Sequence, residues 1–390
     1  MIIKYNTIII GAGASGLMCA QHLNKDHIIL EKTNSSANKL LLTGNGRCNL
    51  LNLKPINEFI SNINHNSKSL YSTLNNFSPS NIYDYFSKHI PLTQEDDNRI
   101  YPKSNKSIDI KNILINNVNI KYNTEVLNII PVNNTYKLIT NNIEYFANNI
   151  VVATGGCSYP HTGSNGIANK FANSLNINTI DYYPCETSII TINPLTDLAG
   201  TSFDNVLIKA NKHISFGNLI FTHTGLSGSS IMLLSEHIYK EKIDSVTIDL
   251  LPNTTNDDLI NILTSTPEKQ LTTILHTFFS KKFTLFLLSK NNFNQNILIK
   301  QLNSKQINSL ISLFKNYTIN ILKVNDIKNA IISGGGINIK ELDPKTFCSK
   351  TYKNLYFIGE CVDIHGPIGG YNLTLAFSMA YSAALSINKE

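Results

Sequence analysis

The sequence has no tryptophan, little glycine and no long hydrophobic run. Among its 390 residues only 20 are Gly. The longest apolar runs, such as residues 8–10 and 150–153, have the length of a strand. A membrane-spanning helix needs about 20 apolar residues. A strand-like segment at residues 2–10 leaves no room for a signal peptide. We therefore expect a cytoplasmic protein with no membrane association.

The cysteines and the charges exclude further classes. The six Cys form no C-x-x-C pair and, with the histidines, no zinc-site spacing. We therefore expect reduced thiols and no metal site. The net charge of +6 is modest, but residues 251–329 hold nine Lys against four acidic residues. This Lys-rich segment is compatible with RNA, whose phosphates dominate the affinity of its binding proteins. A solvated helical face explains it equally well.

The few glycines are unevenly placed. None lies between Gly46 and Gly155, and 18 of the 20 fall in six clusters. Glycine is used where the backbone needs a positive φ or must let another group approach closely. We therefore expect a ligand at these clusters, which cover residues 11–16, 44–46, 155–166, 225–228, 334–336 and 359–370.

Hydrophobic patterning predicts an α/β fold. Residues 2–31 are typical of a strand, a glycine turn, a helix and a second strand. Residues 56–118 are mainly helical, with Ser78 as the N-cap of a helix reaching residue 89. A β-meander is expected over 120–153, with separate strands near 143–146 and 150–153. The pattern is β over 188–250 and helical over 255–328. It returns to a strand at 331, a strand at 355–358 and a final helix from about 371.

These elements predict two parts. A Rossmann-like domain with a parallel sheet and a β-meander spans residues 1–188 and resumes over 330–390. An insert, residues 189–329, interrupts it. The insert is β-rich over 189–250 and helical over 251–329.

The strongest motif is Gly11-x-Gly13-x-x-Gly16 with Glu31 twenty residues after Gly11. The first Gly makes the tight turn, the second lets a pyrophosphate approach, and the third lets helix and strand pack. The helix N-terminus favours phosphate. Glu31 ends the second strand, where a carboxylate can bind ribose hydroxyls. The motif predicts dinucleotide binding, but does not separate FAD from NAD(P).

The end of the chain favours FAD. Glu360 and Asp363 follow a buried strand, and an acid there suits a ribityl hydroxyl. Gly369 and Gly370 lead into a helix whose N-terminus suits the flavin edge that gains negative charge on reduction. Between the two ends, the run at residues 39–49 offers two glycines and Arg47 to a phosphate or an anionic flavin.

Taken together, these segments resemble the YhiN/BaiN family of FAD-dependent NAD(P)H oxidoreductases. Seven ordered motifs carry the resemblance across the whole chain: residues 11–16, 39–49, 99–107, 153–163, 221–228, 333–336 and 359–372. Asn45 departs from the family, which usually has Gly there. Phe347 and Cys348 replace the more usual Met-acid pair.

The resemblance implies an FAD domain of the two-dinucleotide-binding type, interrupted by a β-barrel-like and helical insert. It also implies that Val126 contacts the adenine through its backbone. The expected cofactor-binding residues are Gly11, Ala12, Gly13, Ala14, Ser15, Gly16, Glu31, Lys32, Lys39, Gly44, Gly46, Arg47, Cys48, Asn49, Val126, Ala153, Thr154, Gly155, Gly359, Glu360, Asp363, Gly369, Gly370, Tyr371 and Asn372.

Flavin-dependent reduction of a C=C bond needs a proton donor. Cys48, in a Gly-flanked loop beside Arg47, and His223, in the 221–228 run of the insert, are the predicted catalytic residues. Tyr159 and His161 are further candidates, and His365 is expected to order its own loop. Packing of Cys48 against the flavin and loop hydrogen bonding by His223 remain alternatives.

Family members are associated with reduction of activated C=C bonds, including conversion of uridine to dihydrouridine in large-subunit ribosomal RNA. The resemblance therefore suggests FAD as cofactor, NAD(P)H as reductant and ribosomal RNA as partner through the Lys-rich segment. One alternative is a small-molecule ene-reductase or amine oxidase. Another is a non-catalytic FAD-containing RNA-binding or assembly factor. The sequence does not distinguish NADH from NADPH and predicts no oligomeric state.

Overall fold

The structure is a computed structural model that describes residues 3–63 and 65–389. The chain divides into two compact units. Unit 1 comprises Met1–Tyr183 and Ile332–Glu390, and unit 2 comprises Pro184–Ile331. Sequence patterning had assigned residues 189–329 to the insert. No helix in the described part of the chain is both long and apolar enough to span a membrane.

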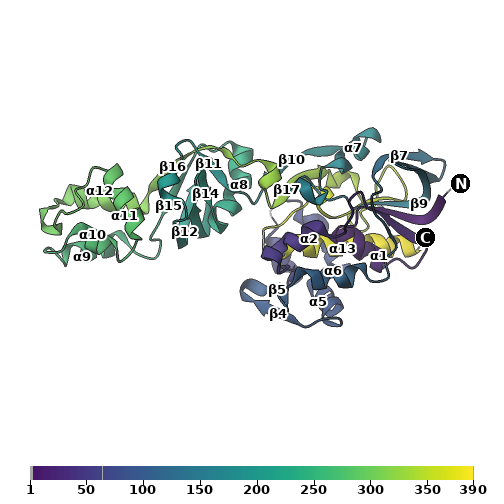
Figure 1. Cartoon of the computed structure of the whole chain (residues 1–390), viewed down its shortest axis with the longest axis horizontal. Helices are drawn as coiled ribbons and strands as arrows, with labels where there is room; N and C mark the ends of the chain where they lie inside the picture. The colour runs from purple at the N-terminus through teal and green to yellow at the C-terminus, as the bar shows by residue number, and fades with distance from the viewer. Residues whose placement is uncertain (1–2, 64, 390) are drawn as a thin grey trace. The chain divides into compact units, whose positions relative to one another are not determined.

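Unit 1 is organised around a seven-stranded sheet (Figure 1). Strand β9 (Glu144–Val152) lies beside β1 (Ile3–Ile10), which pairs in parallel with β2 (His27–Leu30). On its other side, β9 pairs antiparallel with β8 (Thr135–Thr140) through its first half and parallel with β18 (Leu355–Phe357) through its second half. Strands β7 (Val126–Val132) and β6 (Ile120–Lys121) complete the sheet.

The register brings four strand ends to one level. Ile10 lies opposite Leu30 on one side and Val152 on the other, and Val152 in turn lies opposite Phe357. The chain leaves the sheet after each of these residues. We call this side of the sheet the carboxyl edge, and ligands of open parallel sheets bind at such edges.

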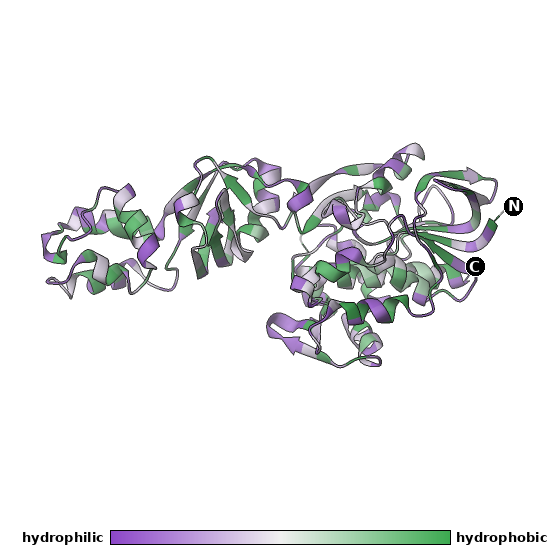
Figure 2. Ribbon diagram, viewed as in Figure 1, coloured by the Kyte–Doolittle hydropathy of each residue, from purple (hydrophilic) through white to green (hydrophobic). Residues whose placement is uncertain are grey.

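Helices cover the sheet and build the rest of unit 1. Helix α13 (Tyr371–Lys389) is buried over most of its length and packs against α1 (Ala14–Gln21). Figure 2 shows hydrophobic residues concentrated where elements pack and hydrophilic residues on the outer turns. The remaining elements of unit 1 are α2 (Asn38–Leu42), β3 (Leu51–Asn52), α3 (Ile56–Ser61), α4 (Tyr71–Asn76), α5 (Pro79–Ser87), β4 (Leu92–Glu95), β5 (Arg99–Pro102), α6 (Ser107–Ile115), α7 (Ile167–Ser174), β10 (Thr179–Cys185, ending in unit 2) and β17 (Ile332–Ile337).

Unit 2 contains a closed barrel and a helical part. The barrel order is β11 (Ile189–Thr191), β14 (Gly225–Ser227), β13 (His213–Phe221), β12 (Ser202–Ala210), β15 (Ser245–Asp249) and β16 (Tyr317–Val324). Between β15 and β16 lie α9 (Asn256–Thr264), α10 (Leu271–Leu275), α11 (Lys281–Lys290) and α12 (Ser304–Lys315). A separate hydrophobic core, which includes Phe221, Phe283 and Phe314, fills this unit.

The expected fold class, a Rossmann-like domain with a barrel-like and helical insert, is confirmed. Several local predictions were wrong. One continuous strand, β9, replaces the separate strands expected near 143–146 and 150–153. The region 189–250, expected to be β-rich, also contains helix α8 (Ser229–Glu241), and the region 251–329, expected to be helical, also contains strand β16. The buried residues Ile231, Leu234 and Ile238 have helical spacing, but the alternation of the flanking strands obscured it.

Candidate functional site

The turn after β1 is shaped by glycine contacts at the carboxyl edge. Gly11 has φ +102°, and a Cβ there would lie 2.6 Å from the carbonyl oxygen of Ala153. A Cβ on Gly16 would lie 2.1 Å from the carbonyl oxygen of Gly11. These two glycines therefore serve packing within the chain. The sequence motif had assigned the same two roles to them.

Gly13 differs from the other two glycines. Its φ is −79°, and the nearest atom to a Cβ there would be 4.0 Å away. It is the N-cap of α1 and offers no side-chain cap, and the first turn of α1 carries no acidic residue. The first N–H groups of a helix have no partner inside the helix. The structure thus leaves the positive end of α1 open beside a residue without a side chain, which suits a phosphate.

Glu31 is buried, with 9% of its surface exposed. Its Oε2 accepts a hydrogen bond from the Ala12 N–H at 2.7 Å, and its Oε1 accepts from the N–H and the hydroxyl of Thr33, both at 2.8 Å. The carboxylate therefore holds the glycine turn in place. An ionised carboxylate has about four acceptor sites, and three are used here, so about one remains for a ribose hydroxyl.

The predicted adenine contact lies close by. Val126 begins β7 and is buried. Just before it, the Thr124 N–H donates to the Glu31 carbonyl at 2.9 Å, and the Asn123 N–H donates to the Thr33 carbonyl at 3.1 Å. The segment before β7 is thereby fixed beside Glu31. Lys32 lies against the loop at Gly163, where an added Cβ would be 3.5 Å from its Cε.

Glu360 connects three of the glycine-rich segments. Its Oε2 pairs with Lys39 Nζ at 2.6 Å, and its Oε1 accepts from the Ser333 N–H at 2.9 Å and from Ser158 Oγ at 3.2 Å. The Ser333 hydroxyl accepts the N–H groups of Cys157 and Ser158, both at 2.8 Å. The expected ribityl ligand is thus the centre of a protein network. Sequence reasoning missed Ser158 and Ser333, which only lie beside glycine clusters.

Asp363 also has a structural role. Its Oδ2 lies 2.7 Å from His65 Nε2, and its Oδ1 accepts the Gly335 N–H at 3.2 Å. Asn66 donates to its carbonyl at 2.7 Å. Asp363 is buried, with 5% of its surface exposed, and these hydrogen bonds join the segment before α4 to β17.

The loop before α13 is held in place by hydrogen bonds to the first turn of that helix. Asn372 accepts the Gly366 N–H at 2.9 Å and donates to the Gly366 carbonyl at 2.7 Å. A Cβ on Gly370 (φ +91°) would lie 2.3 Å from the carbonyl carbon of Leu51. Gly369 has φ +123°, and Tyr371 is buried behind it. The Asn372 side chain therefore orders the loop, and the Gly369–Gly370 backbone lies against β3.

Gly359 brings the two glycine motifs together. It has φ +76°, and a Cβ there would lie 2.6 Å from Ser15 Oγ at the start of α1. Ala153 is buried, and Gly155 has φ +72°. Residues predicted for opposite ends of one FAD, near α1 and after β18, thus meet at the carboxyl edge.

The run at residues 39–49 winds through left-handed backbone. Gly44, Asn45 and Gly46 have φ values of +56°, +55° and +83°. Asn tolerates this conformation better than other non-glycine residues, so Asn45 fits where the family usually has Gly. The Arg47 guanidinium forms an ion pair with Glu95 and lies 4.2 Å from the centre of the Tyr101 ring. Arg47 is thus held by the protein.

Cys48 has no exposed surface. Burial raises the pKa of its thiol from 9.0 to about 12, while a hydrogen bond with Thr43 acts in the opposite direction. A thiol enclosed by protein does not face an open cleft, so this geometry does not support Cys48 as the proton donor.

His223 lies in unit 2, exposed between β13 and β14. The nearby glycines, taken from sequence as a sign of a ligand, have packing roles. A Cβ on Gly225 would lie 2.1 Å from the Ile189 carbonyl oxygen, and one on Gly228 would lie 2.5 Å from the Asn218 carbonyl oxygen. Of the other candidates, Tyr159 lies with its ring 5.9 Å from Lys39 Nζ and beside His161.

Two buried polar atoms of the predicted cofactor-binding residues have no partner in the described part of the protein, which fits a bound dinucleotide cofactor. The hydroxyl oxygen of Thr154 and the Oδ1 of Asn49 are buried, yet neither has a hydrogen-bond partner among the described residues. Buried polar atoms in proteins are normally paired. Both atoms belong to the predicted cofactor set, so a ligand with polar groups would satisfy them.

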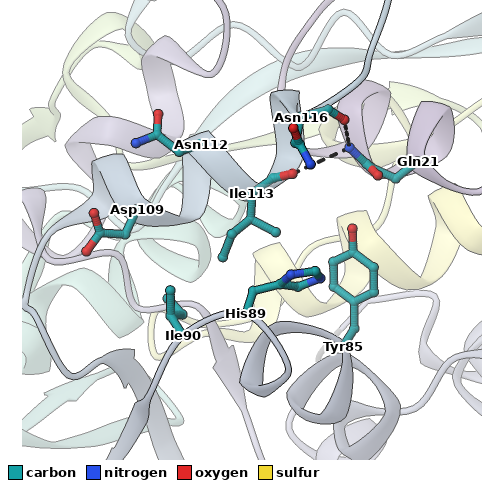
Figure 3. Close-up of a pocket in the computed structure, with 8 residues that line it drawn as sticks. All are labelled: Gln21, Tyr85, His89, Ile90, Asp109, Asn112, Ile113 and Asn116. Atoms are coloured by element: carbon teal, nitrogen blue, oxygen red, sulfur yellow. Dashed lines mark hydrogen bonds between the residues drawn. The ribbon is translucent and has the colours of Figure 1, made fainter.

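A separate cavity of about 340 Å³ lies where α1, α5 and α6 meet. Figure 3 shows Gln21 pointing toward the end of α6, where its Nε2 donates to the carbonyls of Leu114 at 3.0 Å and Asn116 at 2.7 Å. Gln21 thus satisfies carbonyls that the helix end leaves free. The cavity contains none of the predicted site residues.

Comparison with known proteins places the whole chain among relatives. It matches the family described as HI0933-like protein Rossmann domain over residues 5–386. It is 29% identical over 405 residues to the ribosomal RNA dihydrouridine synthase of Haemophilus influenzae, with 98% of each chain covered. It is 26% identical over 400 residues to the 3-dehydro-bile acid delta(4,6)-reductase of Clostridium scindens, with 96% of this chain and 97% of the relative covered. These matches confirm the resemblance inferred from the motifs.

A solved structure shares the fold. The 3-ketosteroid delta1-dehydrogenase of Sterolibacterium denitrificans aligns with a TM-score of 0.53 and 11% identity, covering 99% of both chains. At this identity the likeness concerns the fold alone.

Gly13→Ala tests the open position at α1. A methyl group fits the protein itself, because nothing lies closer than 4.0 Å and φ is negative. It would occupy the space through which a pyrophosphate approaches. We expect an unchanged thermal midpoint for the cofactor-free protein and FAD affinity at least 10-fold lower, a loss of about 1.4 kcal/mol. Unchanged affinity by fluorescence titration would contradict this role.

Cys48 provides a second prediction. With a pKa of about 12 in place of 9.0, its thiolate is roughly 1,000-fold scarcer near pH 8 than that of an ordinary cysteine. Iodoacetamide should therefore label the partly exposed Cys157 and Cys348 first and reach Cys48 only after unfolding. Peptide mass spectrometry measures the order. Labelling of native Cys48 as fast as that of Cys348 would show that its thiol is open to a ligand.

Proposed function

The chain belongs to the HI0933-like protein Rossmann domain family, and on this premise we propose that it is an FAD-dependent oxidoreductase. In this proposal it uses NAD(P)H to reduce an activated C=C bond. The observation that supports it most is the carboxyl edge, where the uncapped start of α1 lies beside the unobstructed Gly13. FAD, when bound, supplies hydride transfer.

Residues of the edge divide the work of binding. The first N–H groups of α1 and the bare backbone at Gly13 hold the pyrophosphate. Glu31 keeps the turn in shape and offers its remaining acceptor site to a ribose hydroxyl. The start of α13, after Gly370, stabilises negative charge on the flavin edge through its dipole. Because Asn372 fixes this loop from within, the geometry is set before the cofactor arrives.

The hydrogen-bond network of Glu360 holds the surrounding segments of the site in fixed positions. Lys39 neutralises the Glu360 carboxylate, and Ser158 and Ser333 complete its hydrogen bonds. A paired and hydrogen-bonded carboxylate holds its neighbours in fixed places. Tyr159, whose ring lies 5.9 Å from Lys39 Nζ, is the proton-donor candidate beside this network.

We propose a uridine of large-subunit ribosomal RNA as the substrate, reduced to dihydrouridine. Full-length similarity to the relative named ribosomal RNA dihydrouridine synthase supports it. In unit 2, six exposed lysines of the Lys-rich segment form no ion pair among the described residues: Lys269, Lys281, Lys282, Lys290, Lys305 and Lys328. Such side chains are suited to phosphate contacts.

A small-molecule substrate is the second candidate. It is favoured by the relative named 3-dehydro-bile acid delta(4,6)-reductase, which is also similar over its whole length. In that case conjugated enones would oxidise the reduced protein, and ribosomal RNA would not.

Mass spectrometry of ribosomal RNA tests the substrate. Large-subunit RNA from a strain that lacks this chain should lose dihydrouridine at one position, and the wild-type gene should restore it. A Gly13→Ala gene should restore it only weakly. An unchanged dihydrouridine content in the deletion strain would exclude ribosomal RNA as the substrate.

The exposed lysines give a test of RNA binding. Replacing Lys269, Lys281, Lys290 and Lys305 together with Ser should weaken binding and lower the slope of log affinity against log salt by about 3, since each phosphate contact contributes roughly 0.7–0.9. The matched control replaces four exposed lysines of unit 1: Lys25, Lys88, Lys103 and Lys345. Fluorescence anisotropy measures both. Equal losses of RNA affinity in the two variants would show that RNA binding depends on net charge alone and not on the lysines of unit 2.

A further inference from the structure

A cluster of three potential metal ligands lies on β13 and α8 of unit 2. His213 begins β13, and His237 and Glu241 lie on the last turns of α8. One ligand atom from each of the three lies within 4.8 Å of the others. On a helix, residues four apart share a face, so His237 and Glu241 lie together on α8.

Hydrogen bonds at the start of α8 hold this helix against β13. At the start of α8, the Ser229 N–H donates to Asn218 Oδ1 at 2.6 Å, and Ser230 Oγ donates to the Asn218 carbonyl at 2.7 Å. Ser215 Oγ then donates to the Ser230 carbonyl at 2.6 Å. The helix thus begins beside the end of β13 and finishes beside His213 at its start. The packing of α8 on barrel strand β13 therefore brings the three side chains of the cluster together.

The two imidazole rings are arranged in parallel. The ring centroids of His213 and His237 are 3.7 Å apart with an interplanar angle of 15°. His213 Nε2 lies 2.8 Å from Glu241 Oε1. The side chain of His213 is 17% exposed and that of Glu241 35%, so an ion from solution can reach the cluster.

The geometry points to a bound divalent transition-metal ion of the Zn²⁺ type, and we propose that His213, His237 and Glu241 ligate it. Two imidazoles and one carboxylate form a donor set that zinc sites use, with a fourth position left for water. Tetrahedral ligands about 2.1 Å from zinc are roughly 3.4 Å apart. The three ligand atoms, now within 4.8 Å of one another, would move to that spacing when the ion binds.

A metal-free ion pair is the competing explanation. Glu241 already accepts from His213 and lies 3.4 Å from Lys212 Nζ, but this explanation leaves His237 only its stacking contact with His213.

The proposed ion would join the C-terminal end of α8 to the β12–β13 hairpin. It replaces the expectation of no metal site, which rested on Cys/His spacing in the sequence. Ligands 24 and four residues apart on a strand and a helix follow no such spacing. The proposed role of the ion is structural. An ion that binds the folded state and not the unfolded state raises the free energy of unfolding.

Calorimetric titration of Zn²⁺ into the full-length protein, stripped with a chelator, tests the proposal. We expect one zinc ion per chain at this site. His237→Ala and Glu241→Gln should each weaken binding at least 100-fold, since even indirect partners of a metal contribute 10–100-fold. His276→Ala, an exposed His of the same unit, should bind zinc as the wild type does.

Thermal unfolding provides the second measurement. Zinc should raise the unfolding midpoint of the wild type and of His276→Ala, but not that of Glu241→Gln, which is nearly isosteric and keeps the fold. If the wild type binds no zinc, or if both ligand variants bind it as tightly as the wild type, the proposal is wrong. If His237→Ala does not fold, Glu241→Gln alone decides.

Discussion

Strand β9 has three neighbours, and the candidate site depends on that arrangement. β1 takes one side, while β8 and β18 divide the other between them. Because β1, from the first third of the chain, and β18, from the last third, both pair with β9, their ends lie at the same edge of the sheet. Gly11 in the turn after β1 then packs on the backbone of Ala153, just after β9, and Gly359 meets Ser15. A larger residue at these contacts would push the two halves of the site apart.

The acidic residues around the edge serve the protein before any ligand arrives. Glu31 holds the glycine turn, Glu360 joins three glycine-rich segments, and Asp363 ties β17 to His65. A site whose charged groups are already paired loses little freedom when a cofactor binds. By contrast, α1 begins without a cap and Gly13 has open space. Rigid walls around an open helix end are the arrangement expected of an anion-binding site.

Much of the fold could be predicted from sequence, because local spacing carries it. The Gly11–Gly16 turn, the cap at Ser78 and the discontinuous domain follow from nearby residues. Partners distant in sequence could not be predicted. No local pattern shows that Ser333 completes the hydrogen bonds of Glu360, that Gly225 packs on Ile189, or that His213 meets His237. For this reason the packing roles of the barrel glycines could not be read from the sequence, and α8 was missed between strands.

The central claim is that the carboxyl edge binds FAD for redox chemistry. Anaerobic titration of the purified chain with NADPH and NADH, followed by absorbance, tests it most directly. We predict that the protein carries about one FAD per chain and that the flavin band bleaches with one of the two nicotinamides at a rate that supports turnover. A chain that binds no FAD would contradict the assignment of the site, and a bound flavin that neither nicotinamide reduces would contradict its role as an oxidoreductase.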